Sequence, residues 1–174
     1  MIVRRRVGVA ISAVALLGCS PTLDWRDVRP DGAGLRALFP CKPGSHEREV
    51  REAGQSLRMS MYACEAGGAT FALGFADTGS AAMAASTLAH WKSAAQRNVQ
   101  GELREDKPIE MVGVDPSARA ARVSLRGRAP GGDAVDVELL LFSRQGMVYQ
   151  ATVFGRRLEP EALDTFFSAL KFDA

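Results

Sequence analysis

The sequence predicts an α+β domain, an antiparallel sheet sandwiched by two helices, and two observations predict it. Apolar residues alternate with period two over several segments that short turns connect, which is typical of antiparallel strands. In two other segments the apolar residues recur every three or four positions, which is typical of helices that pack on a sheet. The predicted order is three or four strands, a helix, three or four strands, and a second helix.

The strands predicted before the first helix cover residues 35–40, 46–52, 57–64 and 70–76. The alternation is clearest in LRMSMYAC, residues 57–64, where apolar and polar positions take turns. The apolar positions are Leu57, Met59, Met61 and Ala63, and those between them are Arg58, Ser60, Tyr62 and Cys64. One polar face predicts a sheet that is covered on one side only.

A change of period marks the first helix, which is predicted from about Ala81 to Val99, before Gly101. One face of this helix would carry Ala84, Leu88, Trp91, Ala95 and Val99.

The second half begins with a charged stretch at 102–107, which we interpret as a solvated loop. Strand-like segments then follow at 109–114, 118–128, 134–142 and 146–154, with a strong turn at 129–133. Residues 163–170 carry an apolar helical face, and Pro160 suits the first turn of that helix.

The first eighteen residues are typical of a secretory signal. Arg4, Arg5 and Arg6 precede VGVAISAVALLG, an apolar run that is too short to span a bilayer. The run ends in LLGC, Leu16 to Cys19, which resembles the lipobox of bacterial lipoproteins. The resemblance implies cleavage before Cys19 and acylation of this cysteine, with chains such as palmitate, and Ser20 favours sorting to the outer membrane. The alternative is an ordinary cleaved signal with an incidental cysteine.

Cleavage before Cys19 would leave 156 of the 174 residues, the usual size of one domain. We expect a signal peptide at 1–18, a lipidated tether at 19–34, and the folded domain at 35–174. Loss of the three signal arginines reduces the 22 basic side chains to 19, against 20 acidic ones. A chain this close to neutral gives no electrostatic argument for a nucleic-acid partner.

A series of segments resembles the PsbP-like and DcrB-like small lipoproteins over roughly residues 35–172. It comprises LFPCKP, a strand with Met and Tyr, FALGFAD before a long helix, LLFSRQGMVYQATVFG, and a helix ending in SALKF. The resemblance implies a central antiparallel sheet between helices and a location outside the cytoplasm. It brings no catalytic residues with it.

Once Cys19 is assigned to the lipid, Cys41 and Cys64 remain as an even pair. In an oxidising compartment such a pair favours a disulfide, and two buried free thiols are the alternative. If residues 46–52 lay between the two strands, the cysteines would be about 9.5 Å apart. A disulfide needs Cα atoms within about 7 Å. The bond therefore requires that residues 46–52 peel away, or that strands 35–40 and 57–64 be neighbours.

The sequence offers no set of catalytic residues. His46 and His90 are the only histidines, Ser45 beside His46 does not make a triad, and G-x-S-x-G is absent. Cys41, His46 and Cys64 lack the close paired spacing of structural zinc sites. We therefore predict that the protein is not an enzyme and that it holds no metal and no cofactor.

Two functions remain. The first is an interaction or assembly module of the cell envelope, anchored to the membrane with its domain in the periplasm, that offers Arg58, Arg122 and Arg126 to an envelope protein partner. The second is a carrier of a small apolar ligand or lipid, held in a gap lined by Met59, Met61 and Phe75.

Overall fold

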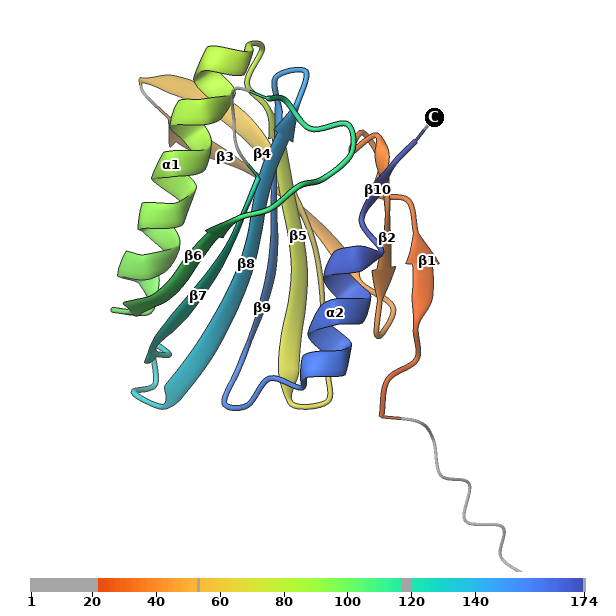
Figure 1. Ribbon diagram of the computed structural model, residues 1–174, viewed down its shortest axis with the longest axis vertical. Helices are drawn as coiled ribbons and strands as arrows, with labels where there is room; N and C mark the ends of the chain where they lie inside the picture. The colour runs from red at the N-terminus through yellow and green to blue at the C-terminus, as the bar shows by residue number, and fades with distance from the viewer. Residues whose placement is uncertain (1–21, 53, 117–119, 174) are drawn as a thin grey trace, which may run out of the picture.

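The structure is a computed structural model, and it describes residues 22–52, 54–116 and 120–173. This part of the chain forms ten strands in two sheets, and two helices. Figure 1 shows helix α1 on one side of the larger sheet and helix α2 with the smaller sheet on the other. The predicted fold class, an α+β domain with an antiparallel sheet and two helices, is confirmed.

The larger sheet has the strand order β3-β4-β5-β9-β8-β7-β6, and each neighbouring pair is antiparallel. Its strands are β3 (Gly44–Glu52), β4 (Gln55–Ala66), β5 (Ala69–Asp77), β6 (Glu102–Pro108), β7 (Ala121–Arg128), β8 (Ala134–Arg144) and β9 (Met147–Gly155). Gln145 and Gly146, both with positive φ, make the two-residue turn between β8 and β9.

Helix α1 (Ala81–Asn98) covers one face of the larger sheet, over β8 and β9. It begins where the Ser80 side chain accepts a hydrogen bond from the backbone N–H of Met83, which caps the first turn. The predicted apolar face is confirmed, since Ala84, Leu88 and Trp91 are buried in a cluster with residues of β7, β8 and β9.

The opposite face is covered by α2 (Pro160–Ser168) and by the smaller sheet, in the order β1-β2-β10. The strands of this sheet are β1 (Arg26–Val28), β2 (Leu35–Phe39) and β10 (Lys171–Phe172). Phe166 of α2 meets Phe39 and Phe71 edge-to-face, with ring centroids 5.3 and 5.4 Å away. These rings belong to the second core cluster, so the larger sheet lies between two apolar layers.

The prediction that β4 is covered on one side only is wrong. Met59 packs in the α1 cluster, whereas Tyr62 and Cys64 pack against the cluster on the other face. The small sheet and α2 supply this second cover. The sequence pattern did not indicate this cover because Tyr62 and Cys64 share their face of β4 with the polar residues Arg58 and Ser60.

The two segments after α1 exchange their predicted roles. Residues 102–107, expected as a loop, belong to the edge strand β6, and residues 109–114, expected as a strand, lie in a connection. β6 is exposed on both faces, so it has no buried side to produce an alternating pattern. Ile109, Met111 and Val114 are apolar because the connection packs against the α2-side core.

Of the residues predicted as a tether, 19–34, those from Leu23 onwards pack against the domain. The backbone N–H of Asp24 bonds the carbonyl of Pro40 at 2.8 Å, Trp25 packs edge-to-face on Phe71, and β1 pairs with β2. The predicted signal at 1–18 and Cys19 lie outside the described residues. Within the described ranges, no helix is long and apolar enough to cross a membrane.

Candidate interaction surface

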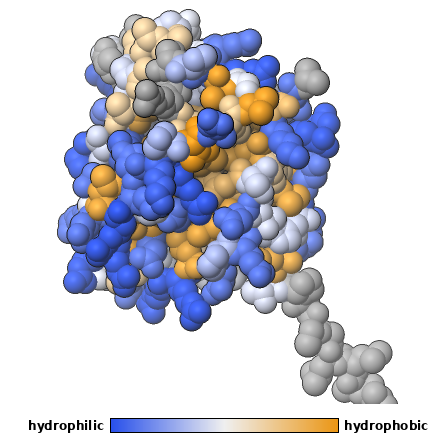
Figure 2. Space-filling model, in the orientation of Figure 1, coloured by the Kyte–Doolittle hydropathy of each residue, from blue (hydrophilic) through white to orange (hydrophobic). Residues whose placement is uncertain are grey.

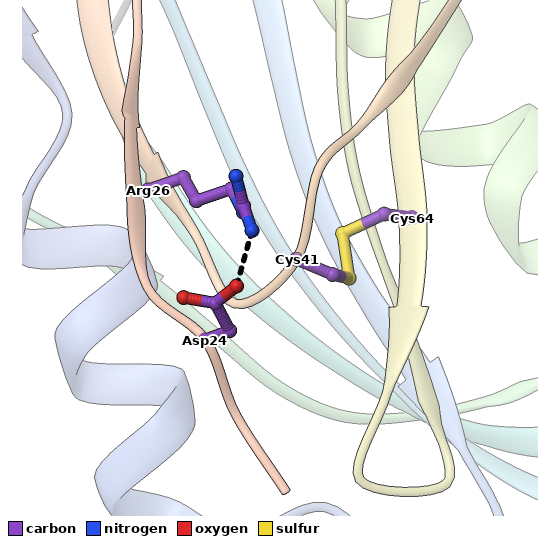
Figure 3. Close-up of a disulfide and its surroundings, with 4 residues drawn as sticks. All are labelled: Asp24, Arg26, Cys41 and Cys64. Atoms are coloured by element: carbon purple, nitrogen blue, oxygen red, sulfur yellow. Dashed lines mark hydrogen bonds and ion pairs between the residues drawn. A yellow bond between two sulfur atoms is a disulfide. The ribbon is translucent and has the colours of Figure 1, made fainter. Parts of the chain in front are cut away.

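The disulfide predicted between Cys41 and Cys64 is present in the structure, with the two Cα atoms 6.0 Å apart. Figure 3 shows the bond running from the segment after β2 to strand β4, with the Asp24–Arg26 ion pair near it. Both cysteines are thereby removed from the nominal zinc set with His46. Among the residues that the structure describes, no three His, Cys, Asp or Glu side chains gather to hold a metal ion.

The two histidines lie on separate elements. His46 is exposed on the edge strand β3, opposite Met61 of β4, and His90 is exposed on α1. Ser45 precedes His46 on the strand, so its side chain points to the other face of the sheet. The structure therefore does not bring Ser45 and His46 together for chemistry.

Tyr149 is an ionisable residue whose pKa the fold shifts strongly. It is 2% exposed, and its phenol donates a hydrogen bond to the carbonyl oxygen of Ala33, 2.7 Å away. Burial raises the pKa of Tyr149 from 10.0 to about 12, because the charged phenolate loses its hydration. A neutral tyrosine bonded to a backbone carbonyl is a structural group.

The arginines expected to share one face do not form one surface. Arg58 is on β4 and Arg122 on β7, with β5, β9 and β8 between them, a separation of roughly 19 Å across the sheet. Arg122 is occupied internally: its guanidinium bonds Glu138 at 3.0 Å and Asp164 at 3.4 Å, and it lies over the ring of Phe167. Its charge is therefore balanced by carboxylates of the domain itself.

Met59, Met61 and Phe75, which were expected to line one gap, do not lie on one face of the sheet. Met61 is paired with Gly74, the neighbour of Phe75 on β5, so Met61 and Phe75 point to opposite faces of the sheet. Met59 packs in the α1 cluster and Phe75 in the α2 cluster.

A surface that the sequence did not reveal lies between the connection after β6, the end of α2 and strand β10. A hollow of about 500 Å³ opens there, which we call the β10 hollow. It is lined by Met111, Val112, Gly113, Arg144, Ser168, Leu170, Lys171, Phe172 and Asp173. Figure 2 shows apolar surface around a depression near the middle of this face, below the connection and beside α2.

The rim of the β10 hollow is unusual in two respects. Val112 is 95% exposed, although it is a large apolar residue at a loop tip. Arg144 places its guanidinium over the ring of Phe172, 4.6 Å from the centroid, so that a cation stands on the apolar wall. An apolar wall with cations at its edge suits a partner with an apolar side chain beside an acidic one.

Strand β10 separates this hollow from a second one of about 530 Å³ on the outer face of the small sheet. Lys171, Phe172 and Asp173 line both hollows, while Arg29 and Arg36 line the second. Of these cations, Arg36 is paired with Asp27 at 3.0 Å. The two hollows and the strand between them form one continuous, mildly basic surface.

Comparison with known proteins gives a fold and no activity. No protein-family model matches the chain, and no curated protein matches it. Among solved structures, the cyanobacterial PsbP (CyanoP) of Synechocystis sp. PCC 6803 aligns with a TM-score of 0.50 at 11% identity, over 94% of this chain and 99% of that one. The fold is PsbP-like.

A protein of unknown function from Pseudomonas aeruginosa also aligns, with a TM-score of 0.42 at 16% identity, over 68% of this chain and 86% of that one. At 11% identity, the likeness to the cyanobacterial PsbP extends to the fold alone.

Within this PsbP-like domain, the β10 hollow was not predicted because residues 109–114 resemble a buried strand in sequence. The available signal was the pair Met111-Val112 after Pro108, an apolar pair in a segment that begins at a strand breaker.

Proposed function

We propose that this protein is a non-catalytic, lipid-anchored interaction or assembly module of the cell envelope. Its acylated Cys19 holds it in the membrane, with the outer membrane favoured by Ser20, and its PsbP-like domain lies in the periplasm. The sequence LLGC supports the anchor, and the Cys41–Cys64 disulfide supports an oxidising compartment.

The observation that carries the interaction role is the exposed Val112 beside the β10 hollow. This large apolar side chain is almost fully exposed to water next to the hollow. A partner that covers it would remove it from water, which contributes about 2 kcal/mol to the free energy of binding. The partner we expect is an envelope protein that places an apolar side chain in the hollow and a carboxylate near Lys171 or Arg144.

Site-specific photo-crosslinking in intact cells tests the docking site. A crosslinker at position 112 should give an adduct of discrete mass, whereas one at Leu103, which is also exposed but lies on β6, should not. Lys171→Glu should weaken the adduct at 112, because the change repels an acidic partner. Equal adducts from 112 and 103, or an adduct indifferent to Lys171→Glu, would contradict the proposed docking site.

The anchor has its own test. Mass spectrometry of the mature N-terminal peptide should find acyl groups on Cys19, and Cys19→Ser should release the protein from the membrane fraction. A Cys19→Ser protein that is processed normally and stays membrane-bound would contradict the anchor. His46→Ala should leave the crosslink unchanged, since the proposed role asks no histidine to move a proton.

One observation favours the second candidate, a carrier of a small apolar ligand or lipid. A hollow of about 270 Å³ beside Leu23 has a mainly apolar lining that includes Phe71, Val153 and Leu163. Lipid extraction of protein isolated without detergent, followed by mass spectrometry, separates the two functions. A stoichiometric lipid that is lost in Leu163→Asp would favour the carrier, with Leu103→Asp as the control.

A further inference from the structure

We propose that one end of the domain rests on the phospholipid headgroup layer, with Arg156 and Arg157 bonding lipid phosphates. This end, which we call the basal end, consists of Thr22, the β4–β5 turn at Gly67–Gly68, and the β9–α2 connection at 156–159. The proposal rests on the proposed anchor at Cys19 and goes beyond it, because it assigns a surface and an orientation.

The first argument is the reach of the chain. Two residues, Ser20 and Pro21, separate Cys19 from Thr22. Three Cα–Cα steps span at most about 11 Å. An acylated Cys19 sits at the level of the headgroups, so Thr22 cannot lie farther than this from the lipid surface.

The second argument is that the domain cannot release more chain to lengthen the tether. Leu23 packs against the α2-side core, Asp24 is bonded to Pro40, and Trp25 lies edge-to-face on Phe71 with the ring centroids 6.3 Å apart. Freeing these residues would expose an aromatic contact and break the pairing of β1 with β2. The fold thus holds its basal end close to the anchor.

The third argument is what lies at this end. The β4–β5 turn is next to the start of the described chain, since a Cβ on Gly67 would stand 3.2 Å from the Leu23 side chain and 3.9 Å from Thr22. Arg157 lines the same hollow as Thr22 and Leu23. Arg156 lines a neighbouring hollow together with Phe154, an aromatic side chain that is 40% exposed.

The charges at the basal end suit a phosphate-bearing, zwitterionic surface. Arg156 and Arg157 have side chains that are 76% and 86% exposed, and they pair with the exposed carboxylates of Asp133 and Glu159. Exposed ion pairs of this kind contribute little stability, so the guanidinium groups can exchange these partners for lipid phosphates. The carboxylates left behind then face the ammonium groups of the same lipids.

The orientation has a consequence for the β10 hollow. Strand β9 runs from Met147, near Arg144 of the hollow, to Gly155 at the basal end, and its nine residues span about 27 Å. Figure 1 shows the start of the described chain at the opposite end of the molecule from the connection after β6. With the basal end on the membrane, the β10 hollow faces away from the lipid, toward a partner.

Hydrogen exchange on vesicles tests the orientation. A chain that starts at Cys19 keeps every described residue, and its Cys19 thiol can be coupled to maleimide-bearing lipid in phosphatidylethanolamine–phosphatidylcholine vesicles. Compared with the uncoupled protein on the same vesicles, amides at 67–68 and 156–159 should exchange several-fold more slowly, on the order of threefold or more. Amides at 111–114 should be unchanged.

Two variants sharpen the test. A Gly/Ser linker of about 20 residues inserted after Cys19 adds a reach of roughly 25 Å and should reduce the protection at the basal end. Arg156→Glu with Arg157→Glu should reduce it as well, while Arg29→Glu, on the outer face of the small sheet, should not. Protection that is equal at both ends, or stronger at 111–114, overturns the proposal.

Because the coupling is chemical, the result does not depend on acylation in the cell. Absence of acyl groups on the native Cys19 would overturn the proposed anchor and leave this measurement intact. Absence of protection at the basal end of the coupled protein would overturn the orientation and leave the anchor intact.

Discussion

The Cα atoms of Cys41 and Cys64 lie 6.0 Å apart even though β3 is the strand paired with β4. The two facts are compatible because β2, which precedes Cys41, belongs to the smaller sheet in another layer. The chain leaves β2 at Pro40 and enters β3 at Gly44, whose partner on β4 is Ala63, the neighbour of Cys64. The disulfide therefore joins the two layers at the point where the chain crosses between them.

Removal of this bond should lower the free energy of unfolding by about 3 kcal/mol, because it closes a loop whose ends are 23 residues apart. Urea denaturation of Cys41→Ser/Cys64→Ser should show the loss, measured in a Cys19→Ser background to exclude intermolecular bonds. Alkylation of the denatured, unreduced parent should label neither cysteine. Labelling of both in protein from an oxidising compartment would contradict the bond.

The sequence predicted the elements that have one well-buried face. Helix α1, the β8–β9 hairpin and α2 all carry enough buried apolar residues to display their period. β6 could not be recognised, because an edge strand exposed on both faces needs no apolar residue at all. The two shortest strands, β1 and β10, contain three and two residues, which is too few for any period to appear.

The candidate site was harder to predict than the fold. The β10 hollow combines the connection after β6, the end of β8 and the C-terminal β10, which are far apart in sequence. The arginines proposed instead were chosen by their outward positions on strands. That criterion does not reveal that Arg122 is paired within the domain, because its partners Glu138 and Asp164 come from β8 and α2.

Gly127→Ala should destabilise the fold strongly. A Cβ at this position would stand 2.2 Å from the carbonyl oxygen of Val99, whose backbone accepts a hydrogen bond from Arg128 at 2.7 Å. Backbone cannot yield as a side chain does, so we expect a cost of about 2–3 kcal/mol in thermal or urea unfolding. Gly131→Ala is the matched control, because its Cβ would meet nothing within 4 Å. Equal effects of the two changes would refute the close approach of α1 to β7.

Arg122→Gln should cost about 1–3 kcal/mol of folding stability, because it leaves Glu138 without its cation in a half-buried position where Ser124 also donates to it. Arg126→Gln, whose side chain is 59% exposed and 3.7 Å from Asp136, should change stability by less than about 0.5 kcal/mol. Urea unfolding at low and high salt measures both. If the two variants behave alike, Arg122 is a surface residue and the proposed internal role is wrong.

The bond from Tyr149 to the Ala33 carbonyl predicts how stability depends on alkaline pH. In the unfolded chain the pKa of this phenol is its ordinary 10.0, and in the fold it is about 12. Because the pKa is higher in the folded state, the contribution of Tyr149 to the free energy of unfolding is complete below pH 10. It is lost as pH rises from about 10 through about 12, since the unfolded chain releases the phenol proton more readily than the folded one.

Tyr149→Phe isolates this effect. Near neutral pH the variant should be less stable by about 1–2 kcal/mol, because the buried carbonyl of Ala33 loses its donor. The difference between parent and variant should then shrink as pH rises above 10, because only the parent carries the titrating phenol at this position.

Urea unfolding of both proteins at stepped pH values measures the difference, and ultraviolet absorbance follows the phenolate directly. The chain has two tyrosines, so the absorbance of the variant reports the titration of Tyr62 alone. Subtracting it from the absorbance of the parent gives the titration of Tyr149. A difference in stability that stays constant from pH 8 to pH 11 would show that Tyr149 titrates alike in the folded and unfolded chain, and the account of its burial would have to be abandoned.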